Sequence, residues 1–268
     1  MNGNGVMLSL PHARCHSENP LAVQDVRLAL AQAGFLMRVL VVENFENTGL
    51  GQIAAVLDER GVGVDTVRAH LGEALPAATD GYDGLVVLGG GQNALDDAGS
   101  PWFPHLLATM RGFVDSGRAT LGVCLGSQLL ARAYGADNLV GGASEFGWQS
   151  VTLTEEGAAD PLLSALPESF PIFQWHDDTF TLPRGAVRLA GNLAAHNQAF
   201  RVGRAGYGTQ FHFEADRRLV REWDGAFAEW LAQRQPDWAG RHEAEAARHG
   251  PAADAAGRAI ASAWAALL

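Results

Sequence analysis

From residue 37 onward, short apolar runs alternate with longer amphipathic stretches along the chain. Uninterrupted apolar runs such as Gly-Leu-Val-Val-Leu at residues 84–88 are typical of parallel strands that are buried on both faces. Strands and helices alternating at these lengths predict an α/β fold, with a mostly parallel central sheet and helices on both of its faces. The pattern predicts strands at Val39–Glu43, Val62–Val67, Gly84–Leu88 and Ala119–Val123, and helices at Gly51–Arg60, Trp102–Ser116 and Ser127–Tyr134.

After about residue 136 the pattern changes to short β-branched and aromatic runs separated by glycine, proline and aspartate. The C-terminal part has helical spacing over Arg217–Arg234 and about Asp254–Leu268, and Pro236 and Pro251 predict a break between these two stretches. The short runs predict a small antiparallel excursion before the chain returns to the main sheet, with strands at Gln149–Thr154, Ile172–Gln174, Val187–Gly191, Ala199–Val202 and Thr209–Phe213.

Residues 1–36 differ from the rest of the chain, because their first 20 positions are rich in Asn, Gly, Ser and His without an apolar period. Two interpretations stay open. Residues 1–36 are either an N-terminal extension outside a functional chain that starts at Met37, or they carry a helix that packs on the domain. We expect residues 37–268 to form a single domain, and a chain that begins at Met37 and fails to fold would exclude the first interpretation.

Composition narrows the class of protein. A length of 268 residues with 47% hydrophobic and 18% charged residues suits a globular protein with a sizeable core. A formal net charge of −11 without a stripe of Lys and Arg argues against nucleic acid as a partner. The two cysteines are too few for a disulfide framework, and neither a long apolar segment nor a signal sequence is visible. We therefore expect a cytoplasmic protein with no contact to a membrane.

Candidate chemistry begins where the fourth predicted strand meets a helix, in the sequence Gly122-Val-Cys124-Leu-Gly126. This is the cysteine form of the Gly-x-Ser-x-Gly elbow, which holds a nucleophile on a tight turn at the carboxyl edge of a sheet. Glycines on both sides remove β-carbons that would collide where strand and helix meet. A helix N-terminus favours the Cys124 thiolate, and the Leu125 N–H would point toward a developing oxyanion. The alternative is a buried, inert cysteine.

Three consecutive glycines, at positions 89 to 91, follow the third predicted strand and should lie beside the elbow. Backbone N–H groups in such a loop can turn toward a ligand, so we expect the N–H of Gly90 to be the second oxyanion donor. A turn without a functional role is the alternative. No phosphate-binding glycine pattern opens a helix at this point.

Residues 210–214, Gln-Phe-His-Phe-Glu, supply a base and a partner for it. Residues two apart share a face of a strand, so His212 and Glu214 would point the same way. A thiolate nucleophile needs a base, and the base needs a group that fixes its tautomer. The sequence thus predicts a catalytic triad of Cys124, His212 and Glu214, with no cofactor and no metal. A metal site built from His212, Glu214, His176 and an adjacent aspartate is the alternative, and no ligand spacing supports it.

Taken together, these segments resemble the class I glutamine amidotransferases, and more narrowly the stand-alone branch similar to the glutaminase domain of GMP synthase. The resemblance covers roughly residues 37–230. It rests on Gly89-Gly90, Gly122-x-Cys124-x-Gly126-x-Gln128, Glu145-Phe-Gly-Trp148, Trp175-His176-x-Asp178 and Gln210-Phe-His212-x-Glu214.

The resemblance implies the flavodoxin-like fold of that family and its glutaminase mechanism. Cys124 would attack the γ-carboxamide of glutamine, the Gly90 and Leu125 N–H groups would hold the oxyanion, and His212 would relay the proton to ammonia. Gln128 would contact the bound glutamine. His176 and Trp148 are candidates for the edge of the site.

Two positions depart from the family pattern. Phe213 stands where relatives usually have proline, which should alter the local strand edge and leave the triad intact. Gly91 stands where relatives often have proline, which would loosen the oxyanion loop.

Three functions remain compatible with the sequence. The first is a glutaminase that passes ammonia from glutamine to a synthase partner subunit. The second is a γ-glutamyl hydrolase or peptidase with the same triad, acting on a small γ-glutamyl compound. The third is a non-catalytic binding or regulatory protein that keeps the fold, and the intact triad argues against it.

Overall fold

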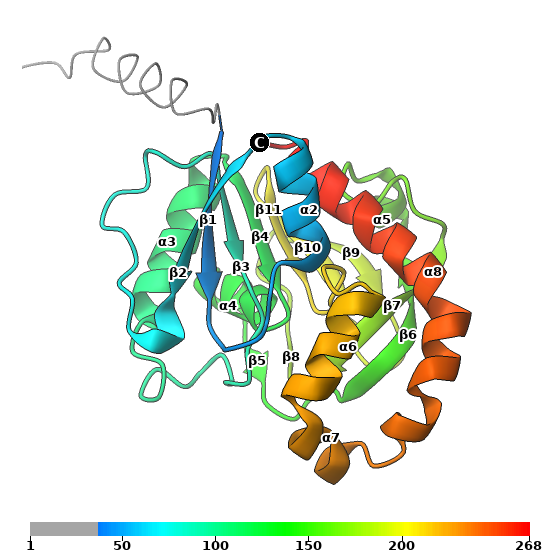
Figure 1. The fold of residues 1–268 in the computed structure, drawn as a ribbon. Coiled ribbons are helices and arrows are strands. Elements are labelled where there is room, and N and C mark those ends of the chain that lie inside the picture. The colour runs from blue at the N-terminus through cyan, green and yellow to red at the C-terminus, as the bar shows by residue number, and fades with distance from the viewer. Residues whose placement is uncertain (1–36) are drawn as a thin grey trace, which may run out of the picture. The chain divides into compact units, whose positions relative to one another are not determined.

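Residues 37–268 are described by a computed structural model, and they are built on a nine-stranded sheet (Figure 1). Residues 1–36, including the expected extension or helix, lie outside the described residues. The strand order across the sheet is β2-β1-β3-β4-β11-β10-β9-β6-β7. The strands are β1 (Arg38–Glu43), β2 (Gly63–Arg68), β3 (Gly84–Val87), β4 (Ala119–Val123), β6 (Glu145–Leu153), β7 (Ser169–His176), β9 (Val187–Gly191), β10 (Ala199–Val202) and β11 (Gly206–Thr209).

The sheet has a parallel part and an antiparallel part that meet at β11. Strands β2, β1, β3, β4 and β11 are parallel neighbours, whereas β10, β9, β6 and β7 each run antiparallel to the strand before them in the sheet. The short strands β5 (Asn138–Leu139) and β8 (Thr179–Phe180) pair separately. The predicted fold class is therefore confirmed, and the antiparallel strands extend the main sheet.

Helices cover both faces of the sheet, and the alternation of side chains along β1 explains why. Val39 and Val41 belong to the core shared with α2 and α8, while Leu40 and Val42 belong to the core shared with α3 and α4. Figure 1 shows α2, α6 and α8 on one side of the sheet and α3 on the other. The helices are α2 (Gly51–Glu59), α3 (Phe103–Asp115), α4 (Leu125–Ala133), α5 (Glu155–Ala159), α6 (Arg217–Ala226), α7 (Ala228–Arg234) and α8 (Trp238–Ala265), with a short 3₁₀ turn at Ala69–Leu71.

The C-terminal helices differ from the prediction in two respects. The stretch predicted as one helix from 217 to 234 divides into α6 and α7 at Phe227. Pro251 lies inside α8 and does not end it. A proline in a helix removes one backbone hydrogen bond, but α8 buries a continuous face that includes Ala246, Ile260 and Trp264. Packing of this face on the rest of the domain outweighs the local cost of the proline.

None of the helices in residues 37–268, including the long α8, has the length and apolar character needed to cross a membrane.

Candidate active site

The elbow at Cys124 has the geometry that its glycines predict. Cys124 stands between β4 and α4 with φ 51° and ψ −111°, a conformation that costs a non-glycine residue about 1–3 kcal/mol. Its backbone N–H donates to the Thr209 carbonyl at 2.8 Å, which ties the strained residue to β11. A β-carbon on Gly122 would overlap the Gly126 carbonyl, and one on Gly126 would overlap the Val87 carbonyl of β3. Both glycines are therefore needed for the close contact of α4 with the sheet.

The Cys124 thiol is free and only 6% of the residue is exposed. Its Sγ lies 3.6 Å from the Trp175 carbonyl oxygen, and the Gln210 side-chain amide approaches the same sulfur at 3.7 Å. A cysteine with polar partners on the wall of a cavity differs from the inert, apolar cysteine considered as the alternative.

His212 and Glu214 are paired, as predicted, but neither lies in a strand. The prediction of a strand over 209–213 is wrong beyond Thr209, because β4 ends at Val123 and leaves β11 without a parallel neighbour past that point. The His212 N–H instead donates to the Phe173 carbonyl of β7 at 2.9 Å. His212 Nδ1 lies 2.7 Å from Glu214 Oε1, with both residues buried.

Gly89 lies between His212 and Cys124, the predicted base and nucleophile. A β-carbon on Gly89 would lie 3.2 Å from His212 Cε1 and 3.4 Å from Cys124 Cβ, so both side chains pack against this one residue. The His212 ring also contacts Trp223, whose ring centroid is 5.2 Å from that of His212 in an edge-to-face arrangement. A glycine and an indole thus both pack against the imidazole.

The charge state of His212 follows from these neighbours. Burial by itself would lower the pKa of His212, and it is the largest single effect. The charges on Glu214 and Cys124, with hydrogen bonds to both, act in the opposite direction and together raise the pKa of His212 well above 6.5. The folded protein therefore holds the proton on this imidazole more tightly than water would.

The two expected oxyanion donors lie in the same cavity as Cys124, since Gly90 and Leu125 both line it. Neither backbone N–H donates a hydrogen bond to any acceptor in residues 37–268. The loop after β3 is fixed at its base by Leu88, whose N–H donates to the Val42 carbonyl at 3.0 Å, and by Asn44, whose side chain donates to the Leu88 carbonyl at 2.9 Å.

Gln128 also lines the cavity and belongs to a chain of buried amides. Its Nε2 donates to Gln210 Oε1 at 3.2 Å and faces the Asp178 carbonyl at 3.4 Å. Gln210 in turn reaches the Cys124 sulfur. This role of Gln210 was not predicted, although its place two residues before His212 is part of the segment that resembles the family.

The two edge candidates have different positions. His176 lines the cavity, and its ring contacts the Asp178 carbonyl through Nδ1 at 3.0 Å and Glu145 Oε2 through Nε2 at 3.1 Å. Trp148 does not line the cavity. It is buried against Phe173 and Trp238, at ring-centroid distances of 5.2 and 5.8 Å, and its part is to fill the core.

Glu145 is a buried carboxylate that supports this region. Besides His176, it accepts hydrogen bonds from Asn192 Nδ2 at 2.6 Å and from Gln198 Nε2 at 2.5 Å. Within residues 37–268, no group of three or more His, Cys, Asp and Glu side chains has an arrangement suited to a metal ion. His176 and His212 are each paired with a carboxylate of their own.

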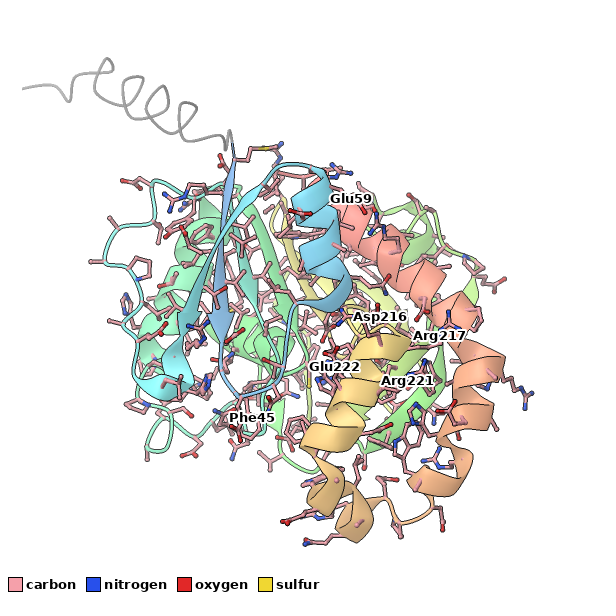
Figure 2. All side chains as sticks on the ribbon, viewed as in Figure 1. Phe45, Glu59, Asp216, Arg217, Arg221 and Glu222 are labelled. Atoms are coloured by element: carbon pink, nitrogen blue, oxygen red, sulfur yellow. The ribbon has the colours of Figure 1, made fainter. Side chains whose placement is uncertain are left out.

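The cavity has a volume of about 460 Å³, and its lining contains two kinds of side chain. The polar members include Gln92, Asn93, Gln128 and the adjacent carboxylates Asp177 and Asp178. The aromatic members, which we call the aromatic wall, are Phe45, Trp175, Trp223, Phe227 and Trp230. Figure 2 shows Phe45 in the loop after β1, at the end of the sheet where α7 also lies.

The aromatic wall was not predicted from the sequence. Three of its members, Trp223, Phe227 and Trp230, are spaced by four and three residues, which would place them on one face of a helix. That spacing is the sequence feature that could have indicated the wall. By itself it does not distinguish a core face from a cavity wall.

Comparisons with known proteins indicate the family of the chain. Residues 41–221 match the family model described as glutamine amidotransferase class-I. The chain is 34% identical to the glutamine amidotransferase-like protein YfeJ of Salmonella typhimurium over 186 residues, which cover 66% of this chain and 76% of that protein. It is 31% identical to a glutamine-hydrolyzing GMP synthase subunit of Methanoculleus marisnigri over 54% of this chain and 75% of that protein.

Two further similarities extend the range of relatives. Gamma-glutamyl peptidase 5 of Arabidopsis thaliana is 30% identical over 53% of this chain and 58% of that protein. The crystal structure of a glutamine amidotransferase from Thermotoga maritima superposes with a TM-score of 0.78 at 27% identity, and covers 86% of this chain and 97% of that chain.

Proposed function

This chain belongs to the class I glutamine amidotransferase family, and from that premise we propose that it hydrolyses the γ-carboxamide of glutamine through a thioester on Cys124. One observation carries the proposal. The strained elbow residue Cys124 and the buried pair of His212 and Glu214 meet at a single cavity, next to two backbone N–H groups that have no acceptor in residues 37–268.

The mechanism assigns one task to each group. The Cys124 thiolate attacks the γ-carbonyl carbon, and the carbonyl electrons move onto an oxygen that the Gly90 and Leu125 N–H groups stabilise. The protonated His212 gives its proton to the amide nitrogen, the C–N bond breaks and ammonia leaves. Water then gives a proton back to His212 and attacks the thioester. Glutamate leaves, and the thiolate and imidazolium are restored.

Glu214 and Gln210 support this cycle without taking part in bond breaking. Glu214 accepts from His212 Nδ1, which directs the other ring nitrogen toward the reacting atoms. Gln210 donates a hydrogen bond toward the sulfur and helps to orient it. Gln128, a polar residue of the cavity lining, would contact the amino-acid end of the substrate.

Two kinds of reaction are open to a protein of this family, and they differ in the amine that is released. The similarity to the GMP synthase subunit favours a glutaminase that hands ammonia to a synthase partner. The cavity volume of about 460 Å³ favours a γ-glutamyl hydrolase that releases a larger amine, because cavities of roughly 300–1,000 Å³ accept ligands larger than an amino acid. The similarity to a γ-glutamyl peptidase supports this second candidate.

The test is glutamate release from L-glutamine by the full-length protein, with Cys124→Ala as the inactive variant. Cys15→Ala is the matched control, because it removes the only other cysteine. A glutamine-like alkylating agent should label wild-type protein and Cys15→Ala at one site and leave Cys124→Ala unlabelled. Absence of both glutamate release and labelling would refute the proposal.

A further inference from the structure

The aromatic wall is formed by Phe45, Trp175, Trp223, Phe227 and Trp230, and apart from the packing of Trp223 against His212 it has no task in the release of ammonia. Its rings contact one another in sequence: Trp175 lies 5.8 Å from Trp223, 5.3 Å from Phe227 and 5.1 Å from Trp230 between ring centroids. Except for Trp223, the members are only partly buried. Large aromatic side chains left partly exposed around a cavity mark a binding surface for an apolar group.

The wall begins at the catalytic residues proposed above. Trp223 packs against His212, with ring centroids 5.2 Å apart, and the Trp175 carbonyl lies 3.6 Å from the Cys124 sulfur. His212 must lie beside the leaving nitrogen in order to protonate it. Any substituent on that nitrogen therefore extends past His212 along Trp223 and Trp175.

The polar members of the cavity lining suit the other end of the substrate. Gln128, Asp177 and Asp178 match the charged α-amino end of a glutamyl group. Asp177 and Asp178 each accept through one carboxylate oxygen, from the Ser144 hydroxyl and the Gly141 N–H respectively. When these residues bind the glutamyl group, the amine half of the substrate is the part that remains for the wall.

We propose that the preferred substrates are γ-glutamyl amides whose nitrogen carries an aromatic substituent, and that the aromatic wall binds this substituent. The inference rests on the proposed hydrolysis through Cys124 and names the substrate class for that site. The chemistry is unchanged: the amide C–N bond breaks as the thioester forms, the arylalkyl amine leaves with the proton from His212, and water hydrolyses the thioester. An unsubstituted amide such as glutamine has no group on its nitrogen that could contact the wall.

The test compares kcat/KM of the full-length protein for three substrates: γ-glutamyl-benzylamide, γ-glutamyl-ethylamide and glutamine. The first two release alkylamines and differ in that a phenyl ring replaces a methyl group, so the ring's contribution is isolated from the chemistry of the leaving group. We expect the benzylamide to exceed the ethylamide by on the order of tenfold or more, since burying an aromatic ring in a fitted site supplies at least that discrimination.

A pair of variants locates the effect. Trp230→Leu should lower the benzylamide-to-ethylamide ratio at least fivefold. Tyr134→Leu is the matched control, because Tyr134 is a partly buried aromatic residue at the C-terminal end of α4, away from the cavity lining. It should leave the ratio unchanged.

The outcomes separate this inference from the function on which it rests. Equal kcat/KM for the two substituted amides, or hydrolysis of glutamine alone, overturns the aromatic substrate class and leaves the glutaminase proposal standing. A ratio that Trp230→Leu does not change overturns the role of the wall. No hydrolysis and no labelling of Cys124 refutes both. If Cys124 is labelled without turnover, protection from labelling by the two amides gives the same comparison and decides between the same outcomes.

Discussion

Gly126, the second residue of α4, packs so closely on Val87 of β3 that a β-carbon at position 126 would overlap the Val87 carbonyl oxygen. This contact fixes the distance between the elbow helix and the sheet, and with it the position of Cys124. The glycine is therefore a structural requirement of the site as well as of the core.

Gly126→Ala is expected to reduce the free energy of unfolding by about 1–3 kcal/mol, because helix α4 must move away from β3 to accept the methyl group. The matched control is Gly112→Ala in α3, where a β-carbon would meet nothing within 4 Å. That change should stabilise the protein by about 0.5–1 kcal/mol, since alanine favours a helix more than glycine does. Urea unfolding of both variants checks the prediction, and a Gly126→Ala protein as stable as wild type would contradict the close contact.

Gly89→Ala tests the space between nucleophile and base. The new methyl group would lie 3.2 Å from His212 Cε1 and 3.4 Å from Cys124 Cβ, so the two side chains must shift by a few tenths of an ångström. We expect kcat to fall roughly 10–100-fold, because small displacements of reacting groups are costly in rate. The free energy of unfolding should change by much less than the activation free energy of the reaction. Equal turnover by wild type and variant would show that the spacing does not limit the reaction.

Glu214→Gln tests the electrostatics of His212. The pKa of folded His212 is raised well above 6.5, so its proton binds more tightly in the folded than in the unfolded state. The resulting stabilisation is fully present below the unfolded value of about 6.5 and is lost as pH rises through the folded pKa. Since Gln carries no charge, the variant should have a lower His212 pKa by NMR titration.

The difference in unfolding free energy between wild type and Glu214→Gln should accordingly be largest at a pH below about 6.5 and shrink as the pH rises. The pH-dependent part should vanish when both proteins also carry His212→Asn. A difference that stays constant across this range would rule out Glu214 as the group that raises the pKa.

Glu145→Ala is expected to be among the most destabilising single changes in this region. It removes the acceptor for Asn192, Gln198 and His176 in a buried setting, at a cost of about 3–5 kcal/mol. Glu243→Ala is the control, because Glu243 is highly exposed and, among residues 37–268, forms an ion pair with Arg221 alone, at 3.4 Å. Its effect should stay within about 0.5 kcal/mol. Thermal unfolding compares the two, and similar melting temperatures would contradict the role assigned to Glu145.

Local sequence patterns were sufficient to predict β1 to β4, the first four strands of the parallel part of the sheet. Gly84–Leu88 is apolar without interruption, and Ala119–Val123 has Thr120 as its one polar residue, because helices cover both faces of these strands. The elbow was equally accessible, since the constraints on Gly122, Cys124 and Gly126 act over a few residues.

Features that depend on distant contacts were not accessible in this way. The strand predicted through Phe213 ends at Thr209, because its neighbour β4 stops at Val123, far away in the sequence. Pro251 continues α8 because packing outweighs propensity. Trp148 and Glu145 both lie in β6. Successive residues of a strand face opposite ways, so the sequence alone does not show which of them faces the site.

The hydrogen bond from the Cys124 amide to Thr209 can form only late in protein synthesis, because Thr209 follows Cys124 in the chain. Gln210, which follows Thr209 and donates a hydrogen bond to the Cys124 sulfur, lies 86 positions after Cys124 in the chain. At 5–20 residues per second, Cys124 is synthesised on the order of 4–17 s before Gln210. Until β11 is made, β4 is an open sheet edge and nothing on that side holds the backbone of the elbow. The geometry of the elbow is thus complete only when the later half of the sheet has joined the earlier half.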